Sequence, residues 1–320
     1  MPINKFRPGQ VWCDTEGRPI QAHGGGVTFH EGIYYWYGEN KTGCSARDRK
    51  LPWHAGVNCY SSRDLFNWKH EGVVLPARPD DPAHDLHPLN IMDRPHVIFN
   101  DRTGRFVMWM KIVRGGWGGA QSTGIAVADS PTGPFEYLRS FLPCGMASGD
   151  ANFFMEPAPE KKYYWVFNRP HTSVVIADLT DDTLDVTGMY SLHFPHAGPP
   201  AAREAPVVVK RNERYYLISS GTTGYAPNPS EWAEADLIHG PWRVHGNPCV
   251  GPKAETSFDA QFASAFEVVG RPNCFIGIAD RWTPDDIADS RYVWLPLLFE
   301  DGRLSIRWFD EWDLSVFDAP

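Results

Sequence analysis

The chain has 320 residues, of which 42% are hydrophobic and 13% aromatic, and it contains 29 glycines and 28 prolines. This hydrophobic content excludes an intrinsically disordered chain, and the density of glycine and proline indicates many turns and argues against long helices. The formal net charge is −9 and no basic run is present, which argues against nucleic acid and anionic membranes as partners.

The first residues, MPINKFRPGQ, contain no apolar segment of the kind found in secretory signals, and nowhere do 18 apolar residues follow one another. The six cysteines are widely scattered and include no CxxC pair. We therefore expect a cytoplasmic protein that carries reduced thiols, does not associate with a membrane and has no cysteine-based metal site.

Five segments along the chain share one layout: a polar residue, a short strand, a turn and a strongly aromatic strand. They are residues 22–39, 93–111, 149–168, 203–221 and 258–280. The polar residues that lead them lie 54 to 70 residues apart, a period typical of propeller blades. These lead residues are His23, Asp93, Asp150, Glu204 and Gln261.

Turns and further strands fit the same plan. Hairpin turns are indicated at residues 30–32, 101–104 and 211–213, each between β-rich runs. A third strand is indicated in each of the first four repeats, and residues 292–308 supply two outer strands in the fifth. The sequence therefore predicts an all-β, five-bladed β-propeller that forms one domain over residues 1–320. A β-sandwich or a series of unrelated hairpins is the alternative, and the fivefold recurrence argues against it.

The inner strands of a propeller converge on a central channel, so the five lead residues are predicted to surround one pocket. Two carboxylates facing one pocket suit glycoside hydrolysis, in which one acid protonates the leaving oxygen and a second group activates water. Glu204 is the candidate acid because it lies at a partly apolar rim, where burial raises the pKa of a carboxyl group. A structural ion pair with Arg203 is the alternative for Glu204.

Six ordered strings carry a resemblance to a known family. They are GRPIQAHGGGVTFHEGIYYWYGENK, RPHVIFNDRTGRFVMWMK, DSPTGPF, REAPVVVKRNERYYLISSGTTGYAPNP, TSFDAQ and DRWTPDDIADSRYVWLPL. Together they resemble the catalytic domain of the exo-β-1,3-galactanases of glycoside hydrolase family 43. The resemblance implies an inverting, exo-acting hydrolase that releases galactose from β-1,3-linked galacto-oligosaccharides. Because the family also holds β-galactofuranosidases, α-L-arabinofuranosidases and β-xylosidases, the terminal sugar stays open.

The resemblance also implies an unusual catalytic set. Most of family 43 uses an Asp of the first blade as general base, but this chain has Ala-His-Gly-Gly-Gly at residues 22–26. The galactanase branch shares this absence, and a Gln that matches Gln261 is thought to serve instead. A neutral amide would have to orient the water or act as its imidic-acid tautomer, or Gln261 only binds a sugar hydroxyl. Asp150 matches the residue that tunes and orients the acid.

Further positions are implied to bind substrate. Glu39 matches a carboxylate that holds hydroxyls of the terminal galactose. Asp93, followed by Arg94, stands where the galactanase pattern has Glu, and because Asp is about one methylene shorter, its contact with sugar or water is expected to shift or be lost. The remaining implied positions are Thr222 and Thr223 in a substrate-contacting loop, and Asp280, Arg281 and Trp282 near the channel, where they bind substrate or are structural.

No cofactor is expected, and although some family members hold an ion in the channel, no metal ligands are predicted. His84, His87 and His96 lie close in sequence but lack ligand spacing. The absence of a leader and of an appended carbohydrate-binding module favours a short imported oligosaccharide or glycoside as substrate. A sugar-binding propeller without catalytic activity is the alternative from another class, supported by the missing first-blade Asp. The oligomeric state is left open.

Overall fold

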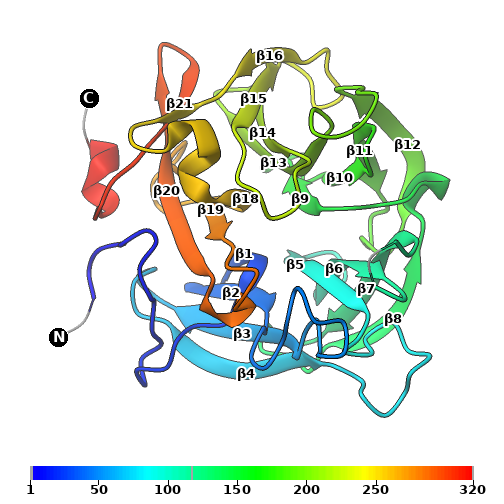
Figure 1. The fold of residues 1–320 in the computed structure, drawn as a ribbon. Helices are drawn as coiled ribbons and strands as arrows, with labels where there is room; N and C mark the ends of the chain where they lie inside the picture. The colour runs from blue at the N-terminus through cyan, green and yellow to red at the C-terminus, as the bar shows by residue number, and fades with distance from the viewer. Residues whose placement is uncertain (1–2, 117, 319–320) are drawn as a thin grey trace.

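A computed structural model describes residues 3–116 and 118–318. Five sheets stand around a central axis, and Figure 1 shows them as the blades of a propeller. In the first four blades the strands follow chain order from the axis outward. The predicted all-β, five-bladed propeller is confirmed. One domain over residues 1–320 stays a prediction, and its ends, residues 1–2 and 319–320, lie outside the described residues.

The strands of each blade follow one another along the chain. Blade 1 consists of β1 (His23–His30), β2 (Ile33–Glu39), β3 (Gly56–Ser62) and β4 (Lys69–Pro76). Blade 2 consists of β5 (Ile91–Asn100), β6 (Arg105–Val113), β7 (Gln121–Ala128) and β8 (Glu136–Phe141). Blade 3 consists of β9 (Ala151–Met155), β10 (Tyr163–Arg169), β11 (Ser173–Leu179) and β12 (Val186–His193). Blade 4 consists of β13 (Arg203–Arg211), β14 (Arg214–Gly221), β15 (Ser230–Ala235) and β16 (Arg243–Gly246).

The fifth blade has one strand more than the sequence predicts. It consists of β18 (Gln261–Glu267), β19 (Phe275–Arg281), β20 (Arg291–Glu300), β21 (Arg303–Arg307) and β17 (Cys249–Val250). The additional strand β17 pairs in parallel with β21 at the outer edge. Short 3-10 segments η1 (Pro143–Gly145), η2 (Ala254–Asp259) and η3 (Ile287–Asp289) join strands, and η4 (Leu314–Asp318) follows β21.

Two-residue hairpin turns set the register of several blades. Between β1 and β2 the turn residues are Glu31 and Gly32, and both have positive φ, 47° and 82°. Asp301 and Gly302 between β20 and β21 repeat the pattern with 50° and 77°. Positive φ at both central residues is the type I′ geometry, whose twist matches that of the flanking strands. The hairpins predicted from these turn residues are therefore present in register.

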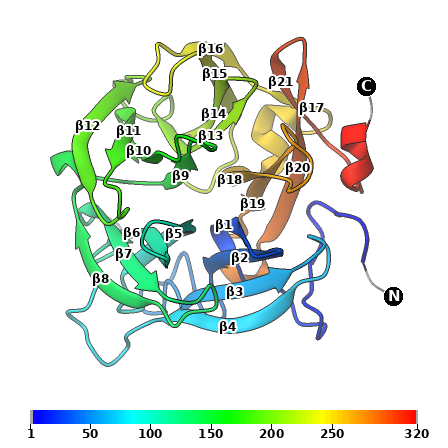
Figure 2. The same ribbon diagram turned by 180° about the vertical axis from the view of Figure 1, so that it is seen from behind.

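Large buried clusters of apolar side chains fill the spaces between adjacent blades. The cluster between blades 5 and 1 is rich in tryptophan: the ring of Trp36 on β2 packs edge-on against that of Trp294 on β20, with centroids 4.8 Å apart. The two ends of the chain join at the same place, where Phe6 and Trp312 form an isolated β-bridge. Both ends lie beside blade 5 in Figures 1 and 2. Aromatic packing and this bridge close the ring between the first and the last blade.

The inner strands β1, β5, β9, β13 and β18 lie side by side around the channel and run in the same direction. Their first residues therefore gather at one mouth of the channel and their last residues at the other. A cavity of about 670 Å³ at the second mouth is lined by the ends of these strands, including Phe29, Lys210 and Phe266. The first mouth collects the predicted site residues.

Candidate active site

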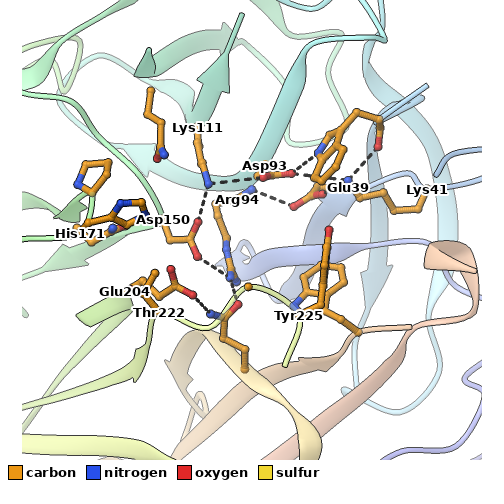
Figure 3. Close-up of a pocket in the computed structure, with 17 residues that line it drawn as sticks. Glu39, Lys41, Asp93, Arg94, Lys111, Asp150, His171, Glu204, Thr222 and Tyr225 are labelled. Atoms are coloured by element: carbon orange, nitrogen blue, oxygen red, sulfur yellow. Dashed lines mark hydrogen bonds and ion pairs between the residues drawn. The ribbon is translucent and has the colours of Figure 1, made fainter. Parts of the chain in front are cut away.

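A cavity of about 210 Å³ opens at the mouth where the inner strands begin. Its walls come from all five blades, and Figure 3 shows how carboxylates and cations alternate across it. The lining residues are Glu39, Lys41, Trp53, Asp93, Arg94, Lys111, Gln121, Asp150, Asn168, Pro170, His171, Glu204, Thr222, Gly224, Tyr225, Gln261 and Trp282. Most of the predicted site residues are thus brought together, although they are spread over more than 240 positions of sequence.

Glu204 and Asp150 form the acidic centre of this pocket. Burial, together with the negative charge of Asp150, raises the pKa of Glu204 to about 7. Burial also acts on Asp150, but Arg94 and Lys111 outweigh it and hold the pKa of Asp150 well below its usual range. Lys111 Nζ lies 3.0 Å from Asp150 Oδ1, and Arg94 Nη2 lies 2.9 Å from Oδ2. Glu204 can therefore carry a proton near neutral pH while Asp150 stays ionised. A pair of carboxyl groups with separated pKa values is typical of sites in which one of them acts as a general acid.

Gln261 lies directly against Glu204. Its Nε2 donates hydrogen bonds to Glu204 Oε1 and to the Ser220 hydroxyl oxygen, both at 2.9 Å. Its Oε1 accepts a hydrogen bond of 2.5 Å from Arg94 Nη2. All the polar atoms of the Gln261 side chain thus have protein partners in the unliganded pocket.

The alternative of an ion pair between Glu204 and Arg203 gains no support from the geometry. Arg203 Nε instead donates to the Ser219 hydroxyl at 3.1 Å and lies 3.7 Å from Glu231 Oε1. Glu204 is therefore held by Gln261, and its carboxyl group faces the pocket.

Glu39 and Asp93 occupy the other end of the pocket, around Lys41 (Figure 3). Lys41 Nζ lies 2.5 Å from Glu39 Oε2 and 3.7 Å from Asp93 Oδ1. Asp93 Oδ1 also accepts a hydrogen bond of 2.6 Å from Trp53 Nε1, and Lys111 Nζ lies 3.8 Å from Asp93 Oδ2. Burial acts to raise the pKa of Asp93, but the two lysines hold it below its usual range. The shorter side chain at position 93 is thus bound by protein groups as well as facing the pocket.

The structure gives a steric reason for the absence of a first-blade carboxylate. Gly24 has φ +62°, and a Cβ at this position would overlap Oε1 of Glu39. A Cβ on the next residue, Gly25, would overlap the backbone oxygen of Tyr37. The Glu39 carboxylate, which also accepts the Arg94 backbone N–H at 3.0 Å, fills the space into which a side chain of the first blade would project.

Two predicted residues lie behind the pocket wall. His23 and Asp280 are fully buried and do not line the cavity. Asp280 Oδ1 lies 3.1 Å from His23 Nδ1, and Asp280 Oδ2 accepts the backbone N–H of Gly24 at 3.1 Å. Asp280 thus supports the irregular start of β1 that makes room for Glu39. Trp282, by contrast, lines the cavity, where its ring meets that of Tyr225 with centroids 6.3 Å apart.

The two predicted residues of the loop after β14 also differ in location: one lines the cavity and the other does not. Thr222 lines the cavity, whereas the Thr223 hydroxyl donates to the backbone oxygen of Ala226 and accepts a hydrogen bond of 2.7 Å from Asn228 Nδ2. Thr223 therefore holds the loop that presents Thr222 and Tyr225. Arg281 also lies outside the lining and donates to the backbone oxygen of Phe258.

Sequence reasoning did not identify several of the lining residues, chiefly Lys41, Trp53, Lys111, His171 and Tyr225. A usable signal existed for one of them. In the hairpin of blade 2 the lead residue Asp93 pairs across the strands with Lys111, and in blade 1 His23 pairs with Glu39. In these two blades the residue of the aromatic strand that pairs with the lead residue therefore returns to the channel mouth, and this register follows from the hairpin turns.

Within residues 3–116 and 118–318, no group of three or more His, Cys, Asp and Glu side chains is arranged to hold a metal ion. His84 and His87 accept backbone N–H groups through Nδ1. His96 is buried in the channel, where burial and then Arg94 lower its pKa to about 3, so it stays neutral. No helix in the described part of the chain has both the length and the apolar character needed to span a bilayer.

A propeller whose channel mouth places a carboxyl group of raised pKa beside an ionised carboxylate has the equipment of a glycoside hydrolase. The sequence model of the glycosyl hydrolases family 43 matches residues 27–264. The chain belongs to this family and is a glycoside hydrolase.

Solved structures extend the comparison to the whole fold. A family 43 β-1,3-galactosidase with bound galactodeoxynojirimycin is 34% identical, with a TM-score of 0.88 over 97% of this chain and 100% of that one. The exo-β-1,3-galactanase of Phanerochaete chrysosporium with β-1,3-galactotriose is 31% identical, with a TM-score of 0.86 over 97% of this chain and 68% of that one. An exo-β-1,3-galactanase of Clostridium thermocellum is 32% identical, with a TM-score of 0.83 over 96% and 66%. No curated protein sequence matches the chain significantly.

Proposed function

We propose that this chain is an exo-acting, inverting hydrolase that releases terminal galactose from β-1,3-linked galacto-oligosaccharides. Glu204 is the general acid, and Gln261 positions the attacking water. The observation that carries the catalytic part is the placement of Glu204 in the pocket beside the ionised Asp150, where burial raises its pKa to about 7. An acid of this pKa is protonated often enough near neutral pH to donate to a poor leaving group such as a sugar hydroxyl.

Exo-action is supported by the size of the pocket. Its volume of about 210 Å³ is below the range of about 300–1,000 Å³ of pockets that enclose drug-sized ligands. One sugar ring therefore suits it better than several. The choice of galactose and of the β-1,3 linkage rests on the similar enzymes, which are named for that activity.

Inversion places one requirement on the pocket. The two groups that act on opposite faces of the sugar stand about 6.5–9.5 Å apart in inverting enzymes, because a water molecule lies between one of them and the anomeric carbon. In the unliganded pocket Gln261 Nε2 is 2.9 Å from Glu204 Oε1. Substrate binding must therefore break this contact, so that Glu204 meets the leaving oxygen and Gln261 meets the water.

A different terminal sugar is the second candidate, and Asp93 is the observation that favours it. Its Oδ1 accepts the Trp53 indole N–H and both of its oxygens face lysines, so its capacity to hold sugar hydroxyls is reduced. β-Galactofuranose, α-L-arabinofuranose and β-xylose are the family alternatives.

Incubation with β-1,3-galactobiose and with nitrophenyl glycosides of these three sugars tests the proposal. We expect galactose to be released from the disaccharide at the highest kcat/KM, and the first product seen by proton NMR to be the α-anomer, since inversion changes the β-configuration. If another sugar is released at a higher kcat/KM, that sugar, and not galactose, is the terminal sugar of the substrate. A β-galactose product would exclude inversion.

Lys111→Met is expected to shift the pH dependence of the reaction. The enzyme is active with Glu204 protonated, so kcat/KM falls as the pH rises through the pKa of Glu204, about 7. The charge of Lys111 lowers this pKa, and its removal raises it. The alkaline midpoint of kcat/KM on β-1,3-galactobiose should therefore move to higher pH, by up to about one unit. Lys69→Met, at an exposed lysine paired with Glu71, is the control and should leave the midpoint in place.

A further inference from the structure

Arg94 on β5 has an unfavourable backbone conformation, and its side chain lines the pocket. Its φ is +54°, in the left-handed region that non-glycine residues rarely adopt. The backbone N–H at this bend donates to Glu39 Oε1 at 3.0 Å, and the side chain is 5% exposed. In Figure 3 the side chain extends across the pocket toward Asp150. Strain of this kind persists where the surrounding structure requires it, often at functional sites.

The guanidinium group of Arg94 joins Asp150 to Gln261. One nitrogen, Nη2, donates to Asp150 Oδ2 at 2.9 Å and to Gln261 Oε1 at 2.5 Å. A guanidinium has only donors, so the atom of Gln261 that faces it must be the carbonyl oxygen. The amide nitrogen is thereby turned toward Glu204 and Ser220.

The other partners of Gln261 do not fix this orientation. The Ser220 hydroxyl can donate or accept, and the carboxyl group of Glu204, once protonated, can also do either. If the amide were rotated by 180°, its oxygen would accept hydrogen bonds from the protonated Glu204 and from Ser220, but its NH2 group would face the Arg94 guanidinium, which offers no acceptor. Among the hydrogen bonds of Gln261 in the described part of the chain, the one from Arg94 alone distinguishes the two orientations.

The rotated amide would harm the reaction in two ways. Its oxygen would hold the Glu204 proton that the leaving group needs, and its nitrogen would offer a donor where an acceptor is needed to orient the attacking water. We infer that Arg94 is a positioning residue that fixes the amide orientation of Gln261. This inference rests on the proposed roles of Glu204 and Gln261.

A double-mutant cycle tests the inference. Arg94→Lys keeps a cation beside Asp150 but loses the planar fork, and it is measured alone and combined with Gln261→Ala. We expect Arg94→Lys alone to lower kcat on β-1,3-galactobiose by about 10²-fold, as small misplacements of catalytic groups do. In the Gln261→Ala background, which has no amide to orient, the same change should cost less than about 3-fold. Equal losses in both backgrounds would overturn the inference.

A second readout separates positioning from a structural role. β-Galactosyl fluoride needs no protonation of its leaving group, so the loss caused by Arg94→Lys should be several times smaller on the fluoride than on the disaccharide. A structural defect would lower both rates alike and would weaken galactose binding. If the lysine variant does not fold, Arg94→Gln gives the same two comparisons. A wild-type chain that hydrolyses no sugar of the panel would overturn the proposed function and this inference together, whereas an active wild type with unaffected Arg94 variants would overturn this inference alone.

Discussion

Glu204→Gln is expected to lower kcat on β-1,3-galactobiose by about 10²–10⁴-fold, the contribution typical of a positioned general acid. The substitution replaces the protonated carboxyl group with an amide of the same shape, which cannot give up a proton at neutral pH. The contact with Gln261 survives, because the new amide oxygen can still accept from Nε2. We therefore expect the fold and the Kd for galactose, measured by calorimetry, to change little.

The leaving group shows whether Glu204 acts as an acid. With β-galactosyl fluoride, protonation is not required, so the variant should lose far less activity on the fluoride than on the disaccharide. Its residual activity should also lack the fall above pH 7 that the pKa of Glu204 gives to the wild type. Glu231→Gln, which changes a glutamate of β15 paired with Arg203, is the matched control and should be fully active. A wild-type rate for Glu204→Gln on the disaccharide would exclude Glu204 as the acid.

The repeat period of the sequence was enough to predict most of the fold and the residues at the centre of the site. Because lead residues recur once per blade, the sequence alone places Asp93, Asp150, Glu204 and Gln261 around one channel. The raised pKa of Glu204 followed from the same reasoning, since a carboxyl group at the rim of a packed channel is partly buried. The additional outer strand β17 was missed because two residues leave no pattern.

The site features that the sequence could not predict depend on the direction of side chains and on contacts between residues far apart in the chain. His23 holds the lead position of its repeat, yet it turns away to Asp280, and the pairing of β1 with β2 is irregular between His23 and Gly26. Such bulges change which face a side chain takes, and strand alternation does not show them. Lys41 has the polar context of a surface lysine in sequence, but it is buried between Glu39 and Asp93. Buried ion pairs of this kind join distant segments and become visible only with the fold.

Gly24→Asp is expected to lower kcat/KM by at least about 10²-fold, although it places a carboxylate in the blade that carries the base in most of family 43. The new Cβ would overlap Oε1 of Glu39, and its next neighbour is the Arg94 side chain. Glu39 would have to move, and with it the sugar-binding end of the pocket and the hydrogen bond that its carboxylate accepts from the Arg94 backbone N–H. Steady-state kinetics on β-1,3-galactobiose measure the loss.

Gly270→Asp provides the matched control for the backbone. Gly270 has φ +81°, in the same left-handed region as Gly24, but no atom lies within 4 Å of a Cβ built on it. Both substitutions therefore carry a similar backbone strain of about 1–2 kcal/mol, and only that at position 24 disturbs Glu39. Activity lost at position 24 alone, with a larger loss of thermal stability there than at position 270, would show that the space of the missing base is occupied by Glu39. A Gly24→Asp enzyme faster than the wild type would show instead that the pocket has room for a first-blade carboxylate, and that Gln261 serves in place of a base the fold could still accept.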